Sequence, residues 1–306
     1  MQVVVAGSHG LVGTALVAEL ARRGHGVRRL VRGAPAGPDE VRWDPGAGLL
    51  DPHDLAGTDA VINLAGAGVA DHRLTAAYRR VVLSSRLDTT SLLARTIAAM
   101  DAPPAVLLQA SGIGAYGTYA GRADEVLDES STLGDTFFAA VVRAWEASTA
   151  PAQAAGVRVA HLRSGIVLTP AGGALGRLLP ILRAGVGGPL GSGRQYWSWI
   201  SMPDEVAAIV HLLESAVAGP VNLTAPRPAT NMEITTAFAR ALRRPALVPV
   251  PGFAVRAVLG EFAQEVLGSI RAVPGVLAAS GFRWSHPEVS DVAAWVAGRP
   301  VTPAGH

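Results

Sequence analysis

Over the first half of the chain, short runs of aliphatic and β-branched residues alternate with longer amphipathic stretches. The short runs predict strands at residues 2–6, 27–31, 41–43, 60–64, 106–110 and 157–162. The longer stretches predict helices at residues 11–23, 75–100 and 137–155. In the first of these, Val12, Leu16 and Leu20 would form one apolar face. Because strands that alternate with helices are typical of parallel sheets, we predict an α/β, doubly wound Rossmann fold.

The pattern changes after Gly165, where glycine and proline residues interrupt the apolar runs. We predict a Rossmann domain at residues 1–165, with strands that continue to about residue 225. Residues 166–250 would form substrate-side segments, and residues 251–306 a smaller C-terminal helical subdomain. Glycine-rich loops often carry ligand sites, so we expect the substrate to bind in a cleft made by the part of the chain after Gly165.

The composition is that of a folded globular protein, since 49% of the 306 residues are hydrophobic and 16% are charged. The chain has no cysteine, which excludes disulfides, thiolate zinc sites and cysteine nucleophiles. It also has no lysine, so all 26 cationic side chains are arginines and Schiff-base chemistry is excluded. No spacing of histidine and acidic residues is typical of a metal site, and we predict no metal.

The charge and hydropathy of the chain bear on its partners and location. A net charge of +2 is too small to predict nucleic-acid binding. No apolar run reaches the roughly 18 residues that a membrane span needs, and the first residues do not resemble a signal peptide. We therefore expect a cytoplasmic protein that acts on a small-molecule substrate and binds neither nucleic acid nor membrane. A homodimer is compatible with the sequence.

The strongest local motif lies between the first predicted strand and the first predicted helix. It reads Gly7-Ser8-His9-Gly10-Leu11-Val12-Gly13. Glycines at its first, fourth and seventh positions allow a tight turn, a close approach of backbone N–H groups to a pyrophosphate, and packing of helix on strand. An ordinary strand-to-helix turn is the alternative. Because the context is α/β, we predict that these seven residues bind a dinucleotide.

The end of the second predicted strand bears on the choice of cofactor. An acidic residue there binds the ribose 2′-hydroxyl of NAD, whereas an arginine suits the 2′-phosphate of NADP. This strand is followed by Arg32, so we predict that NADP(H) is preferred over NAD(H). Arg28 and Arg29 are candidate helpers, but for each of them a solvated charge at the strand edge is the favoured interpretation.

Two later strands also end in residues suited to a ligand. The fourth predicted strand runs into Leu64, Ala65 and Gly66, where small residues would let a cofactor lie against the backbone. A plain β-turn is the alternative. The fifth leads to Ser111 and Tyr116, a hydroxyl and a phenol five residues apart. We predict that the first three residues bind the cofactor and that Ser111 and Tyr116 are catalytic.

With these segments, the chain resembles the extended short-chain dehydrogenases/reductases, which include sugar-nucleotide epimerases and dehydratases. More narrowly, it is similar to the atypical epimerase-family, or NAD-dependent epimerase/dehydratase-like, proteins, which carry a small C-terminal domain of unknown function. The resemblance spans nearly the whole chain. Its motifs include Asn63-Leu64-Ala65-Gly66, Ser85-Arg86, Ser111 to Gly117, Trp145-Glu146, Leu162 to Leu168, Gly172 to Leu175, Ser198-Trp199-Ile200, Asn222 to Pro226 and Gly281-Phe282.

The chain also departs from these families. Ordinary members of the superfamily use a tyrosine and a lysine four residues later, and the lysine lowers the pKa of the phenol. This chain has no lysine, and residues 137–142, where the pair would fall, are apolar. Within the atypical group, Ala67 replaces an expected acidic residue, Leu74 an expected tryptophan and Ser201 an expected histidine. A shared substrate is therefore not implied.

Other residues must then supply acid–base and binding groups. Tyr116 would donate a hydrogen bond or a proton to a substrate carbonyl if Arg163 favoured its phenolate, and the alternative is that it orders a loop. The residues predicted to bind substrate are Arg86, Arg163, Gln195, Trp199 and Asn222. Core packing is the alternative for both Trp197 and Trp199, and for Trp197 it is favoured. The acidic residues at 124–129 are expected to be solvated rather than an acid–base pair.

We therefore predict an NADP(H)-binding oxidoreductase or epimerase-like enzyme. It would act on a small carbonyl or hydroxyl substrate without a Tyr–Lys pair, because positioning the cofactor against the substrate supplies much of the acceleration. The alternative is a non-catalytic NADP(H)-sensing or scaffold protein, which the absence of lysine favours. Turnover of NADPH would support the enzyme, and a cofactor-dependent change of partner or assembly would support the sensor.

Overall fold

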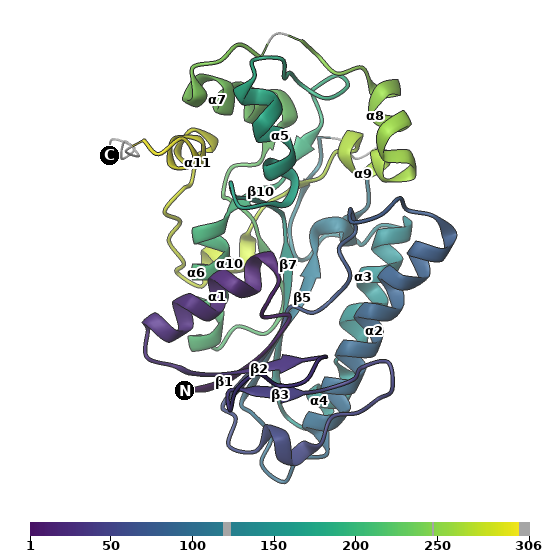
Figure 1. Ribbon diagram of the computed structural model, residues 1–306, viewed down its shortest axis with the longest axis vertical. Coiled ribbons are helices and arrows are strands. Elements are labelled where there is room, and N and C mark those ends of the chain that lie inside the picture. The colour runs from purple at the N-terminus through teal and green to yellow at the C-terminus, as the bar shows by residue number, and fades with distance from the viewer. Residues whose placement is uncertain (119–123, 247, 300–306) are drawn as a thin grey trace. The chain divides into compact units, whose positions relative to one another are not determined.

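The computed structural model describes residues 1–118, 124–246 and 248–299 (Figure 1). The chain divides into two compact units that interleave along the sequence. Unit 1 comprises Met1–Ala115, Phe137–Arg163 and Val206–Val221, and unit 2 comprises Tyr116–Thr136, Ser164–Glu205 and Asn222–His306. This division differs from the consecutive segments predicted from the sequence. The last seven residues of the predicted subdomain at 251–306 lie outside the described residues.

A seven-stranded sheet has the strand order β11-β7-β5-β4-β1-β2-β3. Its strands are β1 (Gln2–Ala6), β2 (Gly26–Val31), β3 (Glu40–Arg42), β4 (Ala60–Asn63), β5 (Val106–Gly112), β7 (Arg158–Ser164) and β11 (Gly219–Leu223). Neighbouring strands from β3 through β1 to β5 pair in parallel. The predicted doubly wound α/β fold is therefore confirmed. The chain order reverses beside β1, and such a point is where these sheets bind ligands.

Helices cover this sheet on both sides (Figure 1). They are α1 (Leu11–Arg22), α2 (Ala76–Ala98), α3 (Phe137–Ala147), α4 (Ala150–Ala154) and α6 (Met202–Glu214), with a 3₁₀ turn η1 (Pro52–Leu55). The single helix predicted at 137–155 is in fact α3 and α4. The hydroxyl of Thr149 donates to the carbonyl oxygen of Glu146 at 2.7 Å, and Pro151 lacks the N–H that would continue the ladder of α3.

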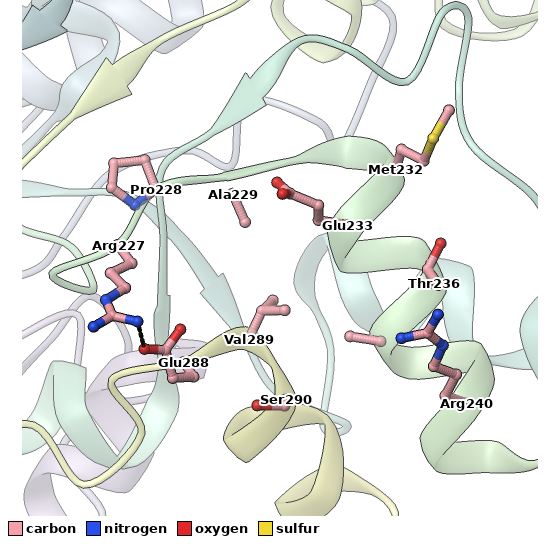
Figure 2. A pocket seen from close by; sticks show the side chains of 11 residues that line it. Arg227, Pro228, Ala229, Met232, Glu233, Thr236, Arg240, Glu288, Val289 and Ser290 are labelled. Carbon is pink, nitrogen blue, oxygen red and sulfur yellow. Dashed lines mark ion pairs between the residues drawn. The ribbon is translucent and has the colours of Figure 1, made fainter. Parts of the chain in front are cut away.

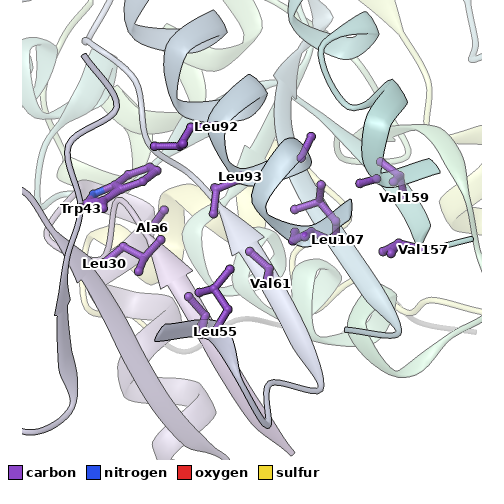
Figure 3. Packing of buried hydrophobic residues seen from close by; sticks show 14 residues of the cluster. Ala6, Leu30, Trp43, Leu55, Val61, Leu92, Leu93, Leu107, Val157 and Val159 are labelled. Atoms are coloured by element: carbon purple, nitrogen blue, oxygen red, sulfur yellow. The ribbon is translucent and has the colours of Figure 1, made fainter. Parts of the chain in front are cut away.

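The core of unit 1 follows from the alternation of side chains along buried strands. Val4, Val61 and Leu107 are in register on β1, β4 and β5, and they form one buried cluster with Leu93 and Ile97 of α2. Figure 3 shows Val61, Leu93 and Leu107 among the residues of this cluster. All five side chains are fully buried, and each contributes about 1.5–3 kcal/mol to the hydrophobic stabilisation. The residues between them on the strands are also buried, as expected for a parallel sheet covered on both faces.

Unit 2 combines short strand pairs with helices. The pairs are β8 (Ile166–Leu168) with β10 (Trp199–Ser201), β9 (Tyr196–Trp197) with β12 (Ala229–Thr230), and β6 (Val126–Leu127) with β13 (Arg271–Ala272). Its other elements are α5 (Gly173–Arg183), α7 (Asn231–Leu242), α8 (Gly252–Leu259), η4 (Gly260–Phe262), α9 (Ala263–Leu267), α10 (Gly275–Ala279) and α11 (Val289–Val296). The 3₁₀ turn η2 (Ile113–Tyr116) lies where the chain first passes from unit 1 to unit 2. A cluster around Trp199 and Phe238 forms the core of unit 2. None of the described helices is both long and apolar enough to cross a membrane.

Candidate functional site

The predicted glycine motif forms the turn between β1 and α1 in unit 1. Gly7 has a φ of +77°, and a Cβ there would lie 2.6 Å from the carbonyl carbon of Leu64. A Cβ on Gly13 would lie 2.1 Å from the carbonyl oxygen of Gly7. Backbone atoms therefore exclude a side chain at both positions. Gly10 closes the turn, because its N–H donates to the oxygen of Gly7 at 3.0 Å.

The same turn presents the N-terminus of α1. The helix has no side-chain cap at Gly10 and no acidic residue in its first turn. Ser8 is buried at the turn, whereas His9 and Gly10 are exposed. The first N–H groups of a helix and its dipole favour a negative charge, so this turn has the donors that a pyrophosphate needs.

The three arginines of the second strand region have different surroundings. Arg28 donates to the carbonyl oxygens of residues 54 and 56, both at 2.8 Å, and to the hydroxyl of Thr58 at 2.6 Å. Arg29 forms ion pairs with Asp39 at 3.0 Å and Glu40 at 3.2 Å. Arg32, directly after β2, is exposed and has no hydrogen bond or ion pair within the described part of the chain. These contacts favour the structural interpretation of Arg28 and Arg29 and leave Arg32 available to a ligand.

The loop after β4 is held by side chains beneath it. Asn63 is fully buried, accepts the N–H of Ala65 at 3.1 Å and donates to Gln109 at 2.9 Å. The N–H of Ala67 donates to the hydroxyl of Ser85 at 3.1 Å. Since Gly7 packs against Leu64, the glycine turn and this loop are neighbours at the carboxyl edge of the sheet. The two segments predicted to bind the cofactor are thus brought together.

Three polar side chains meet where β5 and β7 end. The hydroxyl of Ser111 donates to Oε1 of Glu146 at 2.6 Å, and Arg163 binds both carboxylate oxygens at 2.8 Å. The side chains of Arg163 and Glu146 are 4% and 12% exposed. Burial acts to raise the pKa of Glu146, but the ion pair and the hydrogen bonds outweigh it and hold that pKa below its ordinary value.

This network fixes the hydrogen bonding of Ser111 and Arg163, two residues that were predicted to be catalytic and substrate-binding. The carboxylate of Glu146 is charged, so the proton of Ser111 is directed toward it and the oxygen of Ser111 keeps its lone pairs for a ligand. Arg163 is engaged by Glu146 rather than free to act on a phenol. Glu146 was not predicted as a site residue, although Trp145-Glu146 was among the motifs of the resemblance and would have been the signal.

Tyr116 and Asn222 form a pair inside unit 2. Both are fully buried, and the phenol donates to Oδ1 of Asn222 at 2.8 Å. Nδ2 of Asn222 in turn donates to the carbonyl oxygen of Val273 at 2.9 Å. These contacts favour the alternative in which Tyr116 orders its loop, and the catalytic role given to it stays a prediction without support from its surroundings.

The other predicted residues of unit 2 are also engaged within it. Nε2 of Gln195 donates to the carbonyl oxygen of Leu190 at 2.9 Å. Trp199 is fully buried in the core cluster, and Trp197 joins the same cluster. Ser201, where the resembling group has histidine, is buried and donates to Asp204 at 2.9 Å. Core packing is therefore the interpretation that the contacts favour for both tryptophans.

The acidic residues at 124–129 divide into exposed and structural ones. Asp124 and Glu125 are exposed. Glu129 accepts the N–H of Asn222 at 2.9 Å and that of Val276 at 3.2 Å, so it ties three segments of unit 2 together. Neither arrangement is that of an acid–base pair.

An open pocket of about 580 Å³ lies elsewhere in unit 2, between α7 and α11 (Figure 2). Its most prominent polar contact is the ion pair of Arg227 with Glu288. The side chain of Arg227 is 75% exposed, so this pair lies at the surface. None of the residues predicted to bind or react lines this pocket. The features that favour a ligand lie instead at the carboxyl edge of the sheet in unit 1.

The comparison with known families decides the affiliation. The sequence pattern of the NAD dependent epimerase/dehydratase family matches residues 3–224. The chain belongs to this family. A second match, at residues 250–296, is to a domain of unknown function. The match to the epimerase/dehydratase family includes the glycine turn, Arg32 and the network of Ser111, Glu146 and Arg163.

Relatives in the epimerase/dehydratase family match over nearly the whole chain. An epimerase family protein of Mycobacterium bovis is 44% identical over 300 residues, which cover 97% of this chain and 98% of the relative. The crystal structure of the human epimerase family protein SDR39U1 with NADPH has a TM-score of 0.87 at 35% identity, covering 97% of this chain and 99% of the other. A nucleoside-diphosphate sugar epimerase from Corynebacterium glutamicum has a TM-score of 0.81 at 31% identity, covering 99% of this chain and 59% of the other.

Proposed function

We propose that the protein is an NADP(H)-binding oxidoreductase or epimerase-like enzyme that acts on a small carbonyl or hydroxyl substrate. The observation that carries the proposal is the position of Arg32 relative to the glycine turn. Ala6 of β1 pairs with Leu30 of β2, so Gly7 and Arg32 follow neighbouring strands at the same edge of the sheet. Among the described residues this exposed guanidinium has no hydrogen-bond or ion-pair partner. Its position beside a turn with the donors for a pyrophosphate suits the 2′-phosphate of NADP(H).

The relatives support the choice of cofactor. The family is described as NAD dependent, and the human relative at 35% identity was crystallised with NADPH. In our chain the glycine turn and α1 would hold the pyrophosphate, Arg32 the 2′-phosphate, and the loop at 64–66 the part of the dinucleotide that reaches the middle of the sheet. When bound, the nicotinamide supplies or accepts a hydride.

Ser111 would act on the substrate in place of a Tyr–Lys pair. Its proton is held by Glu146, so its oxygen accepts a hydrogen bond from a substrate hydroxyl and orients it. Arg163 keeps Glu146 charged and in place through two bonds. The proposed active site therefore orients its substrate by hydrogen bonding without a lysine-activated phenol.

A non-catalytic NADP(H) sensor or scaffold is the second candidate. It is favoured by the absence of lysine from the chain and by the contact that occupies the hydroxyl of Tyr116. The two candidates share the cofactor site and differ in turnover. Oxidation of NADPH in the presence of carbonyl compounds would support the enzyme, whereas a change of assembly or partner on binding NADPH, without turnover, would support the sensor.

The cofactor proposal is tested by titrating the protein with NADPH and NADH and following the fluorescence of its six tryptophans. We expect NADPH to bind more tightly. Arg32→Ala should weaken NADPH binding by about 10–100-fold, since a hydrogen bond to a charged group contributes about 1.5–3 kcal/mol, and should leave NADH unchanged. The matched control is Arg42→Ala, an exposed arginine on β3. An unchanged ratio of the two affinities in the Arg32 variant would contradict the proposal.

A further inference from the structure

Arg86 lies on α2, next to the loop that follows β4. Its guanidinium carbon is 4.8 Å from the centre of the Trp145 ring, and Nη1 donates to the carbonyl oxygens of Ala67 and Val82, both at 3.0 Å. One nitrogen and one face of the guanidinium are therefore fixed by unit 1. A stacked and hydrogen-bonded arginine is preorganised, so little side-chain freedom remains to be lost when its other nitrogens bind a ligand.

Across the described ranges, no aspartate or glutamate forms an ion pair with Arg86, and its Nε and Nη2 have no hydrogen bond. Neither nitrogen is among the buried side-chain atoms that lack a hydrogen-bond partner, so both are accessible to solvent. Burial lowers the pKa of Arg86 to about 10, which expresses the cost of holding this charge away from water. A cation held partly away from water is ordinarily paired with an acidic side chain, and among the described residues Arg86 has no such partner.

The surroundings of the free edge point to the ligand site. A Cβ on Gly66 would lie 3.5 Å from Cγ and 3.6 Å from Cζ of Arg86, so the arginine packs directly against the loop predicted to bind the cofactor. Tyr78 is the ionisable side chain whose electrostatic interaction affects the pKa of Arg86. Its hydroxyl donates a hydrogen bond to the carbonyl oxygen of Gly68 at 2.6 Å. The N–H groups of Nε and Nη2 form one edge of a planar fork, which matches two oxygens of a carboxylate or a phosphate.

We propose that Arg86 binds an oxyanion, either a carboxylate or a phosphate, carried by the substrate. This inference rests on the proposed function, because it takes the loop at 64–66 to be the cofactor loop. It narrows the substrate class to a carbonyl or hydroxyl compound with a negatively charged group. The same oxyanion chemistry is available from the phosphates of the cofactor, and the experiment distinguishes the two sources.

The test uses the full chain labelled with ¹⁵N-arginine and follows the Nε–H resonance of Arg86 by NMR. That resonance is identified by its loss in Arg86→Gln, or in Arg86→Lys if the first variant does not fold. Inorganic phosphate and acetate are titrated into the wild type with and without saturating NADPH, with acetamide as the neutral counterpart of acetate. The matched control is Arg80→Gln, which removes an exposed arginine from the same helix.

We expect phosphate or acetate to shift the Arg86 resonance in the presence of NADPH. Acetamide should leave the resonance in place, and the shift caused by the anions should persist in the Arg80 variant. A shift that NADPH abolishes would assign the site to the cofactor and overturn the inference. Absence of any shift would overturn it as well. Failure of the proposed function is seen separately, as absence of NADPH binding in the tryptophan fluorescence of the same samples.

Discussion

Replacing Arg163 by methionine would remove the cation from a buried pair and leave the carboxylate of Glu146 with only the hydroxyl of Ser111. Both bonds of Arg163 to that carboxylate are 2.8 Å long, and the two side chains are 4% and 12% exposed, so water cannot replace the guanidinium. Breaking a buried pair by removing one partner costs about 3–5 kcal/mol. Because the bond from Ser111 remains, we expect a loss at the lower end, about 3 kcal/mol of unfolding free energy near pH 7.

The loss should depend on pH with a definite sign. In the wild type the pKa of Glu146 is lowered, so the pair stabilises the fold above the ordinary carboxyl value of 4.5, and this stabilisation is lost as the pH falls through the lower folded value. In Arg163→Met, burial dominates and raises the pKa of Glu146. Protonation then removes the uncompensated charge, so the difference between variant and wild type should narrow between about pH 7 and about pH 5.

Urea unfolding followed by circular dichroism at both pH values measures the effect. The control is the double variant Glu146→Gln with Arg163→Met, in which no buried charge is left and much of the lost stability should return. A loss below about 1 kcal/mol near pH 7, or an equal loss at both pH values, would refute the reasoning that an uncompensated carboxylate is the cause.

Three further predictions concern other parts of the chain. Gly13→Ala, whose Cβ would lie 2.1 Å from a backbone oxygen, should weaken NADPH binding more than about tenfold and destabilise the protein by about 1–3 kcal/mol. The control Gly176→Ala, whose Cβ would lie 3.9 Å from the nearest atom, should change neither quantity. An NADPH titration and a thermal melt of both variants measure the two effects. Burial raises the pKa of Glu205 to about 7, so the stability of the wild type should fall as the pH rises from about 5 to about 8. In Glu205→Gln this fall should be smaller by roughly 1–3 kcal/mol, because the side chain no longer ionises. Urea unfolding of both proteins at the two pH values measures the difference. Tyr116→Phe should cost about 1–2 kcal/mol of stability, because Asn222 loses its donor, and should leave the affinity for NADPH unchanged. A changed affinity would contradict the interpretation that Tyr116 only orders its loop.

The sequence was a good guide where function depends on local backbone geometry. The turn at 7–13 needs glycine at positions 7 and 13 because backbone atoms lie within 3 Å of where a Cβ would be, and that requirement is visible in the residue types themselves. Arg32 was placed by counting to the end of a strand, and the strand ends where periodicity indicated. Each of these inferences spans only a few consecutive residues.

Contacts between distant segments were beyond the sequence. Glu146 is 35 residues from Ser111 and 17 from Arg163, and no local pattern shows that the three side chains meet. Asn63 and Gln109 touch because β4 and β5 pair in one register, which periodicity does not specify. The strands of unit 2 have only two or three residues, too few for an alternation to be recognised.

The interleaving of the two units has a consequence for biosynthesis. The chain passes from one unit to the other five times, and unit 1 receives its last segment, Val206–Val221, only after two of the three segments of unit 2 have been made. Unit 1 therefore cannot be complete on the ribosome before residue 221 of the 306 has been added. A truncation at residue 165 would leave the sheet without β11 beside β7, an unpaired edge of the kind on which unfinished chains aggregate.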